Sequence, residues 1–187
     1  METEPHKLSD LPMPPRDVPQ NKRQAKVADI LRNRQDLVVV LESLFNPNNI
    51  GAIVRTCDSF GVGRIFYIGQ TIPHLKQRVS ISSTGAEKWV EIKQMDTITD
   101  CYEILRQKKY KICTTYDGPK SINIMGADFT KPTAIVMGHE HRGVSKEAFE
   151  GADFNVRIPM QGFVRCMNVS VACGIILYEA TRQRKLI

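Results

Sequence analysis

The alternation of short apolar runs with helical segments constrains the fold of this chain more than any other feature. Residues 37–41 read Leu-Val-Val-Val-Leu, and such a continuous run is typical of a strand that is buried on both faces. Similar runs predict further strands at residues 64–68, 89–92, 111–115, 133–137 and 154–158. Apolar periodicity predicts helices at residues 49–60, 98–109 and 168–184. The alternation predicts a single α/β domain with a mainly parallel sheet.

The composition excludes several classes of protein. Of 187 residues, 42% are hydrophobic and 25% are charged, which excludes disorder along the whole chain. No apolar run approaches the roughly 18 residues that a membrane-spanning helix needs. The first residues, Met1 to Pro5, lack the basic and apolar regions of a secretory signal. We therefore expect a soluble, cytoplasmic protein with no membrane partner.

The N-terminal part differs from the rest. Five of the ten prolines lie within residues 1–20, which predicts a flexible tail. Residues 21–35 follow a helical pattern, with Val27, Ile30 and Leu31 on one face. The other face carries the basic residues Lys22, Arg23, Lys26, Arg32 and Arg34. This face is either a solvated surface or an arm that contacts phosphates, and the net charge of +6 favours polyanionic partners.

Cysteine and histidine do not predict a metal site. The five cysteines are widely spaced, form no C-x-x-C pair, and are expected to be mostly buried, reduced, apolar side chains. His139-Glu140-His141 lacks the H-E-x-x-H spacing that places two ligands on one helix face. Cys166 is a possible nucleophile, but no neighbouring base supports that interpretation.

Three segments carry residues suited to binding. In residues 46–56, Asn48 or Asn49 suits a helix N-cap, Gly51 permits close approach, and Arg55 follows one and a half turns later. This segment is either a capped helix with a surface arginine or a grip for a phosphate. Residues 135–145 leave a predicted strand at Gly138, and Ser145 suits the cap of a following helix.

The third segment, residues 158–172, also begins at a strand end. It turns at Gly162 and enters the last helix at Asn168. Ligands of open α/β sheets bind at the carboxyl ends of the strands. Both this segment and residues 135–145 are therefore well placed to form a binding site.

These segments resemble the motifs of a known family. The similar residues are Asn49-x-Gly51-x-x-x-Arg55, Gly138-x-Glu140-x-x-Gly143-Val144-Ser145, and Ile158-Pro159-Met160-x-Gly162 with Asn168-Val169-Ser170-Val171-Ala172. In this order they resemble the three motifs of the SpoU/TrmH family of RNA ribose 2′-O-methyltransferases, in the knotted SPOUT superfamily. Five further stretches resemble the members that modify guanosine 18 in the D-loop of tRNA: residues 34–37, 55–58, 87–90, 130–134 and 178–184.

The resemblance implies a trefoil knot near the C-terminus, a homodimer whose site combines both subunits, and S-adenosylmethionine as cofactor. It implies a basic N-terminal helix, with residues 36–187 as the methyltransferase domain and tRNA as substrate. A ribosomal RNA substrate is the first alternative, and a non-catalytic RNA-binding protein on the same fold is the second. RNA contacts are expected from Arg182 and from the basic residues of the N-terminal helix.

The resemblance also implies site residues. The catalytic set is Arg55, Asn49, Glu140 and Asn168, and the cofactor set is Met137, Gly138, Glu140, Gly143, Ile158, Met160, Cys166 and Met167. Arg55 is expected to orient the substrate phosphate, held by Asn49 and Glu140, while Asn168 fixes the last loop. Cys166-Met167 stands where the family usually has Ser-Leu, and a thiol is the weaker hydrogen-bonding group.

Overall fold

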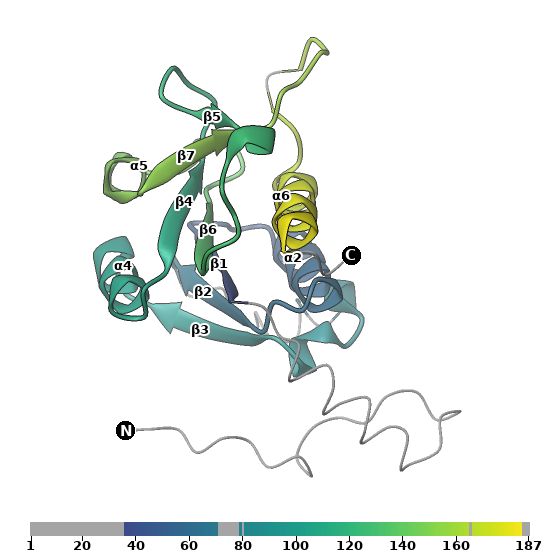
Figure 1. Cartoon of the computed structure of the whole chain (residues 1–187). Coiled ribbons are helices and arrows are strands. Elements are labelled where there is room, and N and C mark those ends of the chain that lie inside the picture. Colours follow the sequence, from purple (N-terminus) through teal and green to yellow (C-terminus); the bar gives the residue numbers. More distant parts are fainter. Residues whose placement is uncertain (1–35, 71–78, 80, 165, 185–187) are drawn as a thin grey trace.

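A computed structural model describes residues 36–70, 79, 81–164 and 166–184. Seven strands form one sheet in the order β3-β2-β1-β6-β4-β7-β5, and every neighbouring pair is parallel (Figure 1). The strands are β1 (Leu37–Glu42), β2 (Arg64–Ile68), β3 (Glu91–Met95), β4 (Lys111–Thr115), β5 (Ile122–Asn123), β6 (Thr133–Met137) and β7 (Phe154–Arg157). The predicted parallel α/β fold is confirmed, whereas the predicted tail and basic helix lie outside the described residues.

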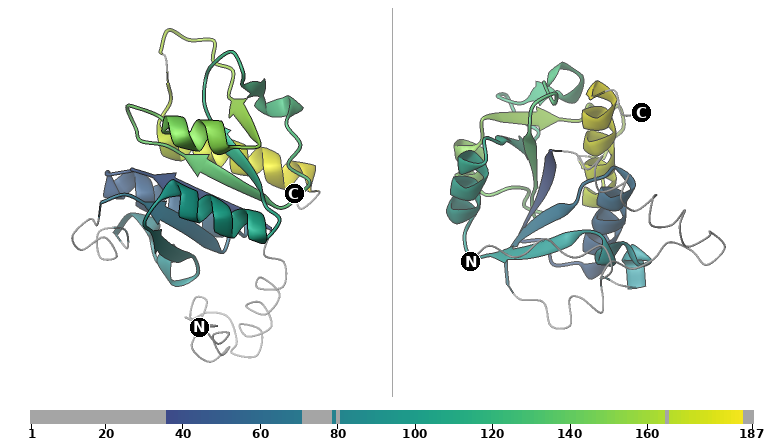
Figure 2. Two further views of the ribbon diagram at one scale, coloured as in Figure 1. Left: turned by 90° about the vertical axis from the view of Figure 1, so that its left-hand side faces the viewer. Right: turned by 60° about the horizontal axis from the view of Figure 1, so that its bottom comes forward.

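Helices cover both faces of this sheet. The helices are α2 (Pro47–Ser59), α4 (Ile98–Gln107), α5 (Lys146–Gly151) and α6 (Val169–Gln183), with the 3₁₀ turns η2 (Ala86–Lys88) and η3 (Ile124–Gly126). Helices α2 and α6 lie on one face, and α4 and α5 lie on the other (Figures 1 and 2). The molecule is therefore a three-layer sandwich, which explains the apolar character of its central strands.

The side chains of β1 supply both cores. Leu37, Val39 and Leu41 belong to the cluster on the side of α2 and α6, and Val38 and Val40 belong to the cluster on the side of α4. All six residues of β1 are buried, because β2 and β6 flank the strand and helices cover both of its faces. The prediction of a fully buried strand is confirmed.

The boundaries of some elements differ from the prediction. The bounds of β2, β4 and β6 are as predicted, but the strand predicted at residues 89–92 is displaced by two residues. Gly85, at φ +95°, leads into η2, and Trp89 ends that turn, so β3 begins only at Glu91. The short elements β5 and η3 were not predicted, because two or three residues show no periodicity.

The cap of α2 is also different. Neither Asn48 nor Asn49 caps the helix; the Oδ1 atom of Asn46 accepts the backbone N–H of Asn48 at 3.0 Å. Pro47 occupies the first helical position, where a missing N–H leaves no hydrogen bond unmade. Asn49 thus lies inside the first turn, and its side chain is free for other contacts.

Two glycines permit close approach of other parts of the chain. A Cβ atom on Gly51 would lie 1.8 Å from Ser82 Oγ, in line with the predicted close approach to the first turn of α2. A Cβ atom on Gly138 would lie 2.2 Å from both Gly143 C and Val144 N. Residues 139–143 form a closed hairpin, because His139 and Gly143 exchange two backbone hydrogen bonds of 2.9 Å. The hairpin folds back over Gly138, so this position has no room for a side chain.

We predict that Gly138→Ala opens this hairpin. The added methyl group would overlap backbone atoms, which cannot move aside as a flexible side chain can, so the free energy of unfolding should fall by about 1–3 kcal/mol. Urea denaturation measures this change. The control is Gly126→Ala, where an added Cβ has no atom within 4 Å. Equal stability of the two variants would contradict the prediction.

Candidate active site

The carboxyl end of β1 anchors the loop that follows β6. Glu42, the last residue of β1, is buried, and its carboxylate accepts the backbone N–H of Ser145 at 2.8 Å and the Ser145 hydroxyl at 2.6 Å. The same hydroxyl oxygen accepts the N–H of Ala148 at 3.0 Å and so caps α5, as predicted for Ser145. Sequence reasoning missed Glu42, although an acid at the end of an otherwise apolar strand is a recognisable signal.

The Asn49 side chain joins the three segments that the sequence singled out. Its Nδ2 atom donates a hydrogen bond to Glu140 Oε1 at 3.1 Å, and its Oδ1 atom accepts one from Asn168 Nδ2 at 3.1 Å. The backbone N–H of Asn46 donates to the same Glu140 oxygen at 3.3 Å. Three of the four predicted catalytic residues thus form one hydrogen-bonded unit.

Asn168 holds its position in this unit through the helix that it caps. Its Oδ1 atom accepts the backbone N–H of Ser170 at 2.8 Å and the Ser170 hydroxyl at 2.6 Å. The Asn168 oxygen therefore caps α6, and its amide nitrogen donates the hydrogen bond to Asn49. The two ends of one side chain connect α6 to α2.

Glu140 offers one unused acceptor. Its Oε2 atom is shielded from solvent and has no hydrogen-bond partner in the part of the chain that the structure describes. A buried carboxylate oxygen without a donor is costly, so this atom marks a place where a donor is missing. The pKa of nearby Tyr67 is raised, first by burial and second by the negative charge of Glu140.

Arg55 lies apart from this unit. It is exposed on α2, and we find no hydrogen bond or ion pair to its guanidinium group among the described residues. The expected grip of Asn49 and Glu140 on Arg55 is therefore not formed within the described part of one chain, where Asn49 and Glu140 bind each other.

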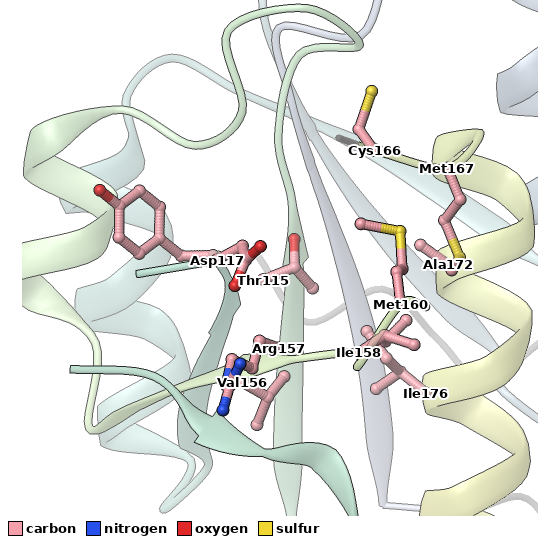
Figure 3. Close-up of a pocket in the computed structure, with 11 residues that line it drawn as sticks. Thr115, Asp117, Val156, Arg157, Ile158, Met160, Cys166, Met167, Ala172 and Ile176 are labelled. Atoms are coloured by element: carbon pink, nitrogen blue, oxygen red, sulfur yellow. The ribbon is translucent and has the colours of Figure 1, made fainter. Parts of the chain in front are cut away.

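A pocket lies where β4, β7 and α6 meet, and its lining residue Met167 directly precedes Asn168 of the unit (Figure 3). Its lining residues are Thr115, Tyr116, Asp117, Val156, Arg157, Ile158, Met160, Cys166, Met167, Ala172 and Ile176. Thr115 Oγ1 donates to the carbonyl of Val136 at 3.2 Å, which connects this wall to the end of β6. Most of the lining residues are apolar or contain sulfur, and the polar or charged ones are Thr115, Tyr116, Asp117 and Arg157.

The comparison with known families shows to which family the chain belongs. A family model described as the SpoU rRNA Methylase family matches residues 36–178. The chain belongs to this family.

Relatives of this SpoU protein agree with the assignment. A tRNA (guanosine(18)-2′-O)-methyltransferase of Aquifex aeolicus is 40% identical over 165 residues, which are 88% of this chain and 78% of the relative. The crystal structure of the A. aeolicus TrmH/SpoU tRNA modifying enzyme is 37% identical with a TM-score of 0.78, and the match covers 89% of this chain and 84% of that one. The SpoU methyltransferase AviRb of Streptomyces viridochromogenes in complex with AdoMet is 27% identical with a TM-score of 0.75, covering 85% and 65% of the two chains.

SpoU methyltransferases use S-adenosylmethionine, and half of the residues predicted to bind it line the pocket. Ile158, Met160, Cys166 and Met167 do so. The other four, Met137, Gly138, Glu140 and Gly143, are not lining residues and belong to the end of β6 and the hairpin after it. Sequence reasoning missed Thr115, Tyr116 and Asp117, although Thr115 ends a predicted strand and the other two directly follow it.

The pocket suits this cofactor in its chemistry. An adenine ring needs apolar walls, which Ile158, Met160 and Ile176 provide. The sugar hydroxyls and the charged amino-acid part need polar groups, which Thr115 and Asp117 place at the same pocket (Figure 3). The residues present therefore fit S-adenosylmethionine.

Arg182, which was predicted to bind RNA, is not among the residues of this site. Arg182 lies near the end of α6, and its guanidinium makes two hydrogen bonds to the carboxylate of Glu179 at 2.8 and 2.7 Å. The basic residues predicted to bind RNA at positions 22, 23, 26, 32 and 34 lie outside the described residues. Among the described residues, no three His, Cys, Asp or Glu side chains are placed to hold a metal ion, and no helix is long and apolar enough to cross a membrane.

The cysteines differ sharply in accessibility. Cys57, Cys101, Cys113 and Cys173 are buried as predicted, whereas Cys166 is exposed at the pocket. Burial raises the pKa of Cys101 to about 12, and burial followed by the neighbouring Cys173 raises the pKa of Cys57. Because only the thiolate reacts with alkylating reagents, these buried thiols should be inert in the folded protein.

We predict that iodoacetamide labels Cys166 before the four buried cysteines, and that S-adenosylmethionine protects it. At a cofactor concentration about ten times its Kd, the labelling of Cys166 should slow about tenfold, because the occupied fraction of the protein is shielded. Mass spectrometry of timed samples measures the rates, and urea-unfolded protein shows that all five thiols can react. A labelling rate at Cys166 that the cofactor leaves unchanged would place its binding site elsewhere.

Proposed function

We propose that this protein transfers a methyl group from S-adenosylmethionine to the ribose 2′-oxygen of guanosine 18 in the D-loop of tRNA. The observation that carries the proposal is the contact of Asn49 with both Glu140 and Asn168, beside a pocket that suits the cofactor. The name of the 40% identical relative supports tRNA guanosine 18 as the target. The family description favours ribosomal RNA as the second candidate substrate.

The residues of the pocket would hold the cofactor, with Ile158, Met160, Cys166 and Met167 around it. When bound, S-adenosylmethionine supplies a sulfonium methyl group that a ribose hydroxyl can attack. The hydroxyl must be held in line with that methyl group, and such positioning contributes much of the rate of a transfer reaction. In our proposal, the Asn49–Glu140–Asn168 unit forms the rigid wall against which the ribose is placed.

Arg55 would act through its charge and its hydrogen bonds. A guanidinium stays protonated near neutral pH and so cannot serve as a base. We propose instead that Arg55 orients the phosphate of the target nucleotide, which accepts the hydroxyl proton. The positive charge would also stabilise the negative charge that develops on the ribose oxygen.

A second copy of the chain would complete the site. Arg55 is exposed on α2, and the Oε2 atom of Glu140 needs a donor that the described part of one chain does not supply. We propose that Arg55 of a second copy donates to this carboxylate in a homodimer. Support comes from α6, where Val171, Ile175 and Tyr178 expose an apolar stripe at helical spacing.

We predict that Ile175→Lys converts the dimer to monomers, because a charge in the centre of this stripe cannot be buried cheaply. Light scattering after size-exclusion chromatography measures the mass. Methylation should be lost with the dimer, while circular dichroism stays that of the folded protein. Met125→Lys is the control, because Met125 is 78% exposed on η3, outside the stripe. A dimer that survives Ile175→Lys would contradict the proposed interface.

We predict that Arg55→Ala lowers the methylation rate by about 10²–10⁴, the range expected for a lost proton-transfer arrangement. Cofactor binding should persist, so S-adenosylmethionine should still raise the Tm of the variant. The assay uses tritium-labelled S-adenosylmethionine with an unmodified tRNA transcript and, separately, with unmodified ribosomal RNA.

A tRNA with 2′-deoxyguanosine at position 18 is the matched control, because it lacks only the accepting oxygen. It should take up no label. Label in this RNA equal to that in ordinary tRNA would exclude guanosine 18 as the target. Label only in ribosomal RNA would contradict tRNA as the substrate. Binding of RNA without label in either RNA would favour a non-catalytic RNA-binding protein.

Other parts of the chain extend the proposal. We propose that residues 21–35 form a basic helix whose Lys and Arg side chains contact tRNA phosphates, and that Arg182 contributes from α6.

The C-terminal trefoil knot is likewise a proposal: α6 follows β7 yet packs on α2, where a Cβ on Gly174 would lie 3.6 Å from Thr56 Cγ2. A tRNA substrate also favours a cytoplasmic location.

A further inference from the structure

Three rings stand beside the Asn49–Glu140 contact and have no part in the function proposed above. The Phe45 ring centroid lies 5.2 Å from that of His139 and 6.4 Å from that of His141, and the two imidazole centroids are 5.9 Å apart. The Phe45 side chain is 55% exposed, and His141 is also exposed. A large ring that remains half exposed is not there to fill the core.

The backbone on both sides of these rings is anchored by burial and hydrogen bonds. Leu44, which precedes Phe45, is fully buried, and Asn46, which follows it, caps α2 and donates to Glu140. On the other side, His139 and His141 flank Glu140 within the hairpin that His139 and Gly143 close. The backbone N–H of His141 donates to Nδ1 of His139 at 3.0 Å, so the neutral His139 ring carries its proton on Nε2.

We propose that Phe45, His139 and His141 form a stacking surface for a nucleobase of the RNA substrate, directly beside the ribose that is methylated. This inference rests on the proposed function and adds a base-binding site to it. Each ring belongs to a residue next to Asn46 or Glu140, so the surface borders the unit against which the ribose is placed. Unpaired bases of RNA loops are recognised by stacking on aromatic and histidine side chains.

The surroundings favour RNA over a protein partner. Arg142 is exposed in the same hairpin and directly follows His141 in the sequence, so this loop carries a positive charge beside its rings. The three rings are tilted to one another by 33–50°, so a base can stack on the exposed face of one ring while the others border it. An exposed aromatic ring with a neighbouring cation matches a base and its phosphate. It contrasts with the stripe on α6, where Val171 and Ile175 are aliphatic and suit a protein interface.

The test measures RNA affinity rather than methylation. Full-length protein is titrated into a fluorescently labelled, unmodified tRNA transcript, and binding is followed by anisotropy at several salt concentrations. Phe45→Ala should weaken binding about tenfold, within the range for the loss of one stacked base. The slope of log K against log salt should stay unchanged, because no phosphate contact is removed.

Matched variants separate stacking from structural damage. Phe45→Tyr keeps the ring and should restore affinity, whereas Phe45→Leu keeps an apolar side chain without a ring and should not. His141→Ala should weaken binding as well, and Met125→Ala, at an exposed apolar side chain on η3, should not. The Tm and the dimer mass should be unchanged in all of them.

Three results would overturn the inference. The first is unchanged affinity of Phe45→Ala and His141→Ala while the wild-type protein binds and methylates tRNA, which leaves the proposed function intact. The second is full affinity of Phe45→Leu, which would mean that no ring is needed. The third is loss of the dimer in Phe45→Ala, which would make the rings a protein interface. Wild-type protein that neither binds nor methylates RNA would overturn the proposed function together with the inference.

Discussion

The amide of Asn49 is the contact on which the rest of the site depends. Its Nδ2 atom donates a hydrogen bond to Glu140, and its Oδ1 atom accepts one from Asn168. An amide can do both through two separate atoms, whereas a carboxylate only accepts and an ammonium only donates. Three loops that are distant in sequence are thereby held in one arrangement.

The sheet makes this contact possible. Because β1 and β6 are parallel neighbours, the loops that leave their carboxyl ends emerge side by side. Glu42 then fixes the start of α5 through Ser145, and Gly138 lets the hairpin fold back close enough for Glu140 to reach α2. Helix α6 packs on the same face as α2, which brings Asn168 to Asn49. Packing and backbone geometry thus place the polar groups, and the hydrogen bonds then fix their orientation.

The sequence predicts the elements whose signal is local. The bounds of β2, β4 and β6 were predicted correctly, because each is a short segment rich in β-branched and apolar residues. The start of β3 was misplaced because Trp89 and Val90 suit a strand, while the turn set by Gly85 takes precedence. The predicted cap at Asn48 or Asn49 was wrong because four nearby residues include three asparagines, and only the position of Pro47 distinguishes them.

The functional site was less accessible to prediction than the fold. Asn49, Glu140 and Asn168 were identified through the family resemblance, but their mutual contacts depend on the packing of α6 against α2, which no local pattern encodes. Tyr116 and Asp117 join the pocket only because β4 lies next to β7. The place of Arg55 depends, in our proposal, on a second copy of the chain, so the contacts within one chain do not define it.

A double-mutant cycle tests the central role of Asn49 most directly. Asn168→Ser keeps an oxygen that can cap α6 but removes the amide that donates to Asn49, and Asn49→Ala removes the acceptor. If the two residues act through their mutual contact, Asn168→Ser should lower kcat/KM for tRNA methylation in the wild-type background and change it little in Asn49→Ala. If Asn168→Ser lowers kcat/KM by the same factor in both backgrounds, the two side chains act independently, and Asn49 does not hold the site together.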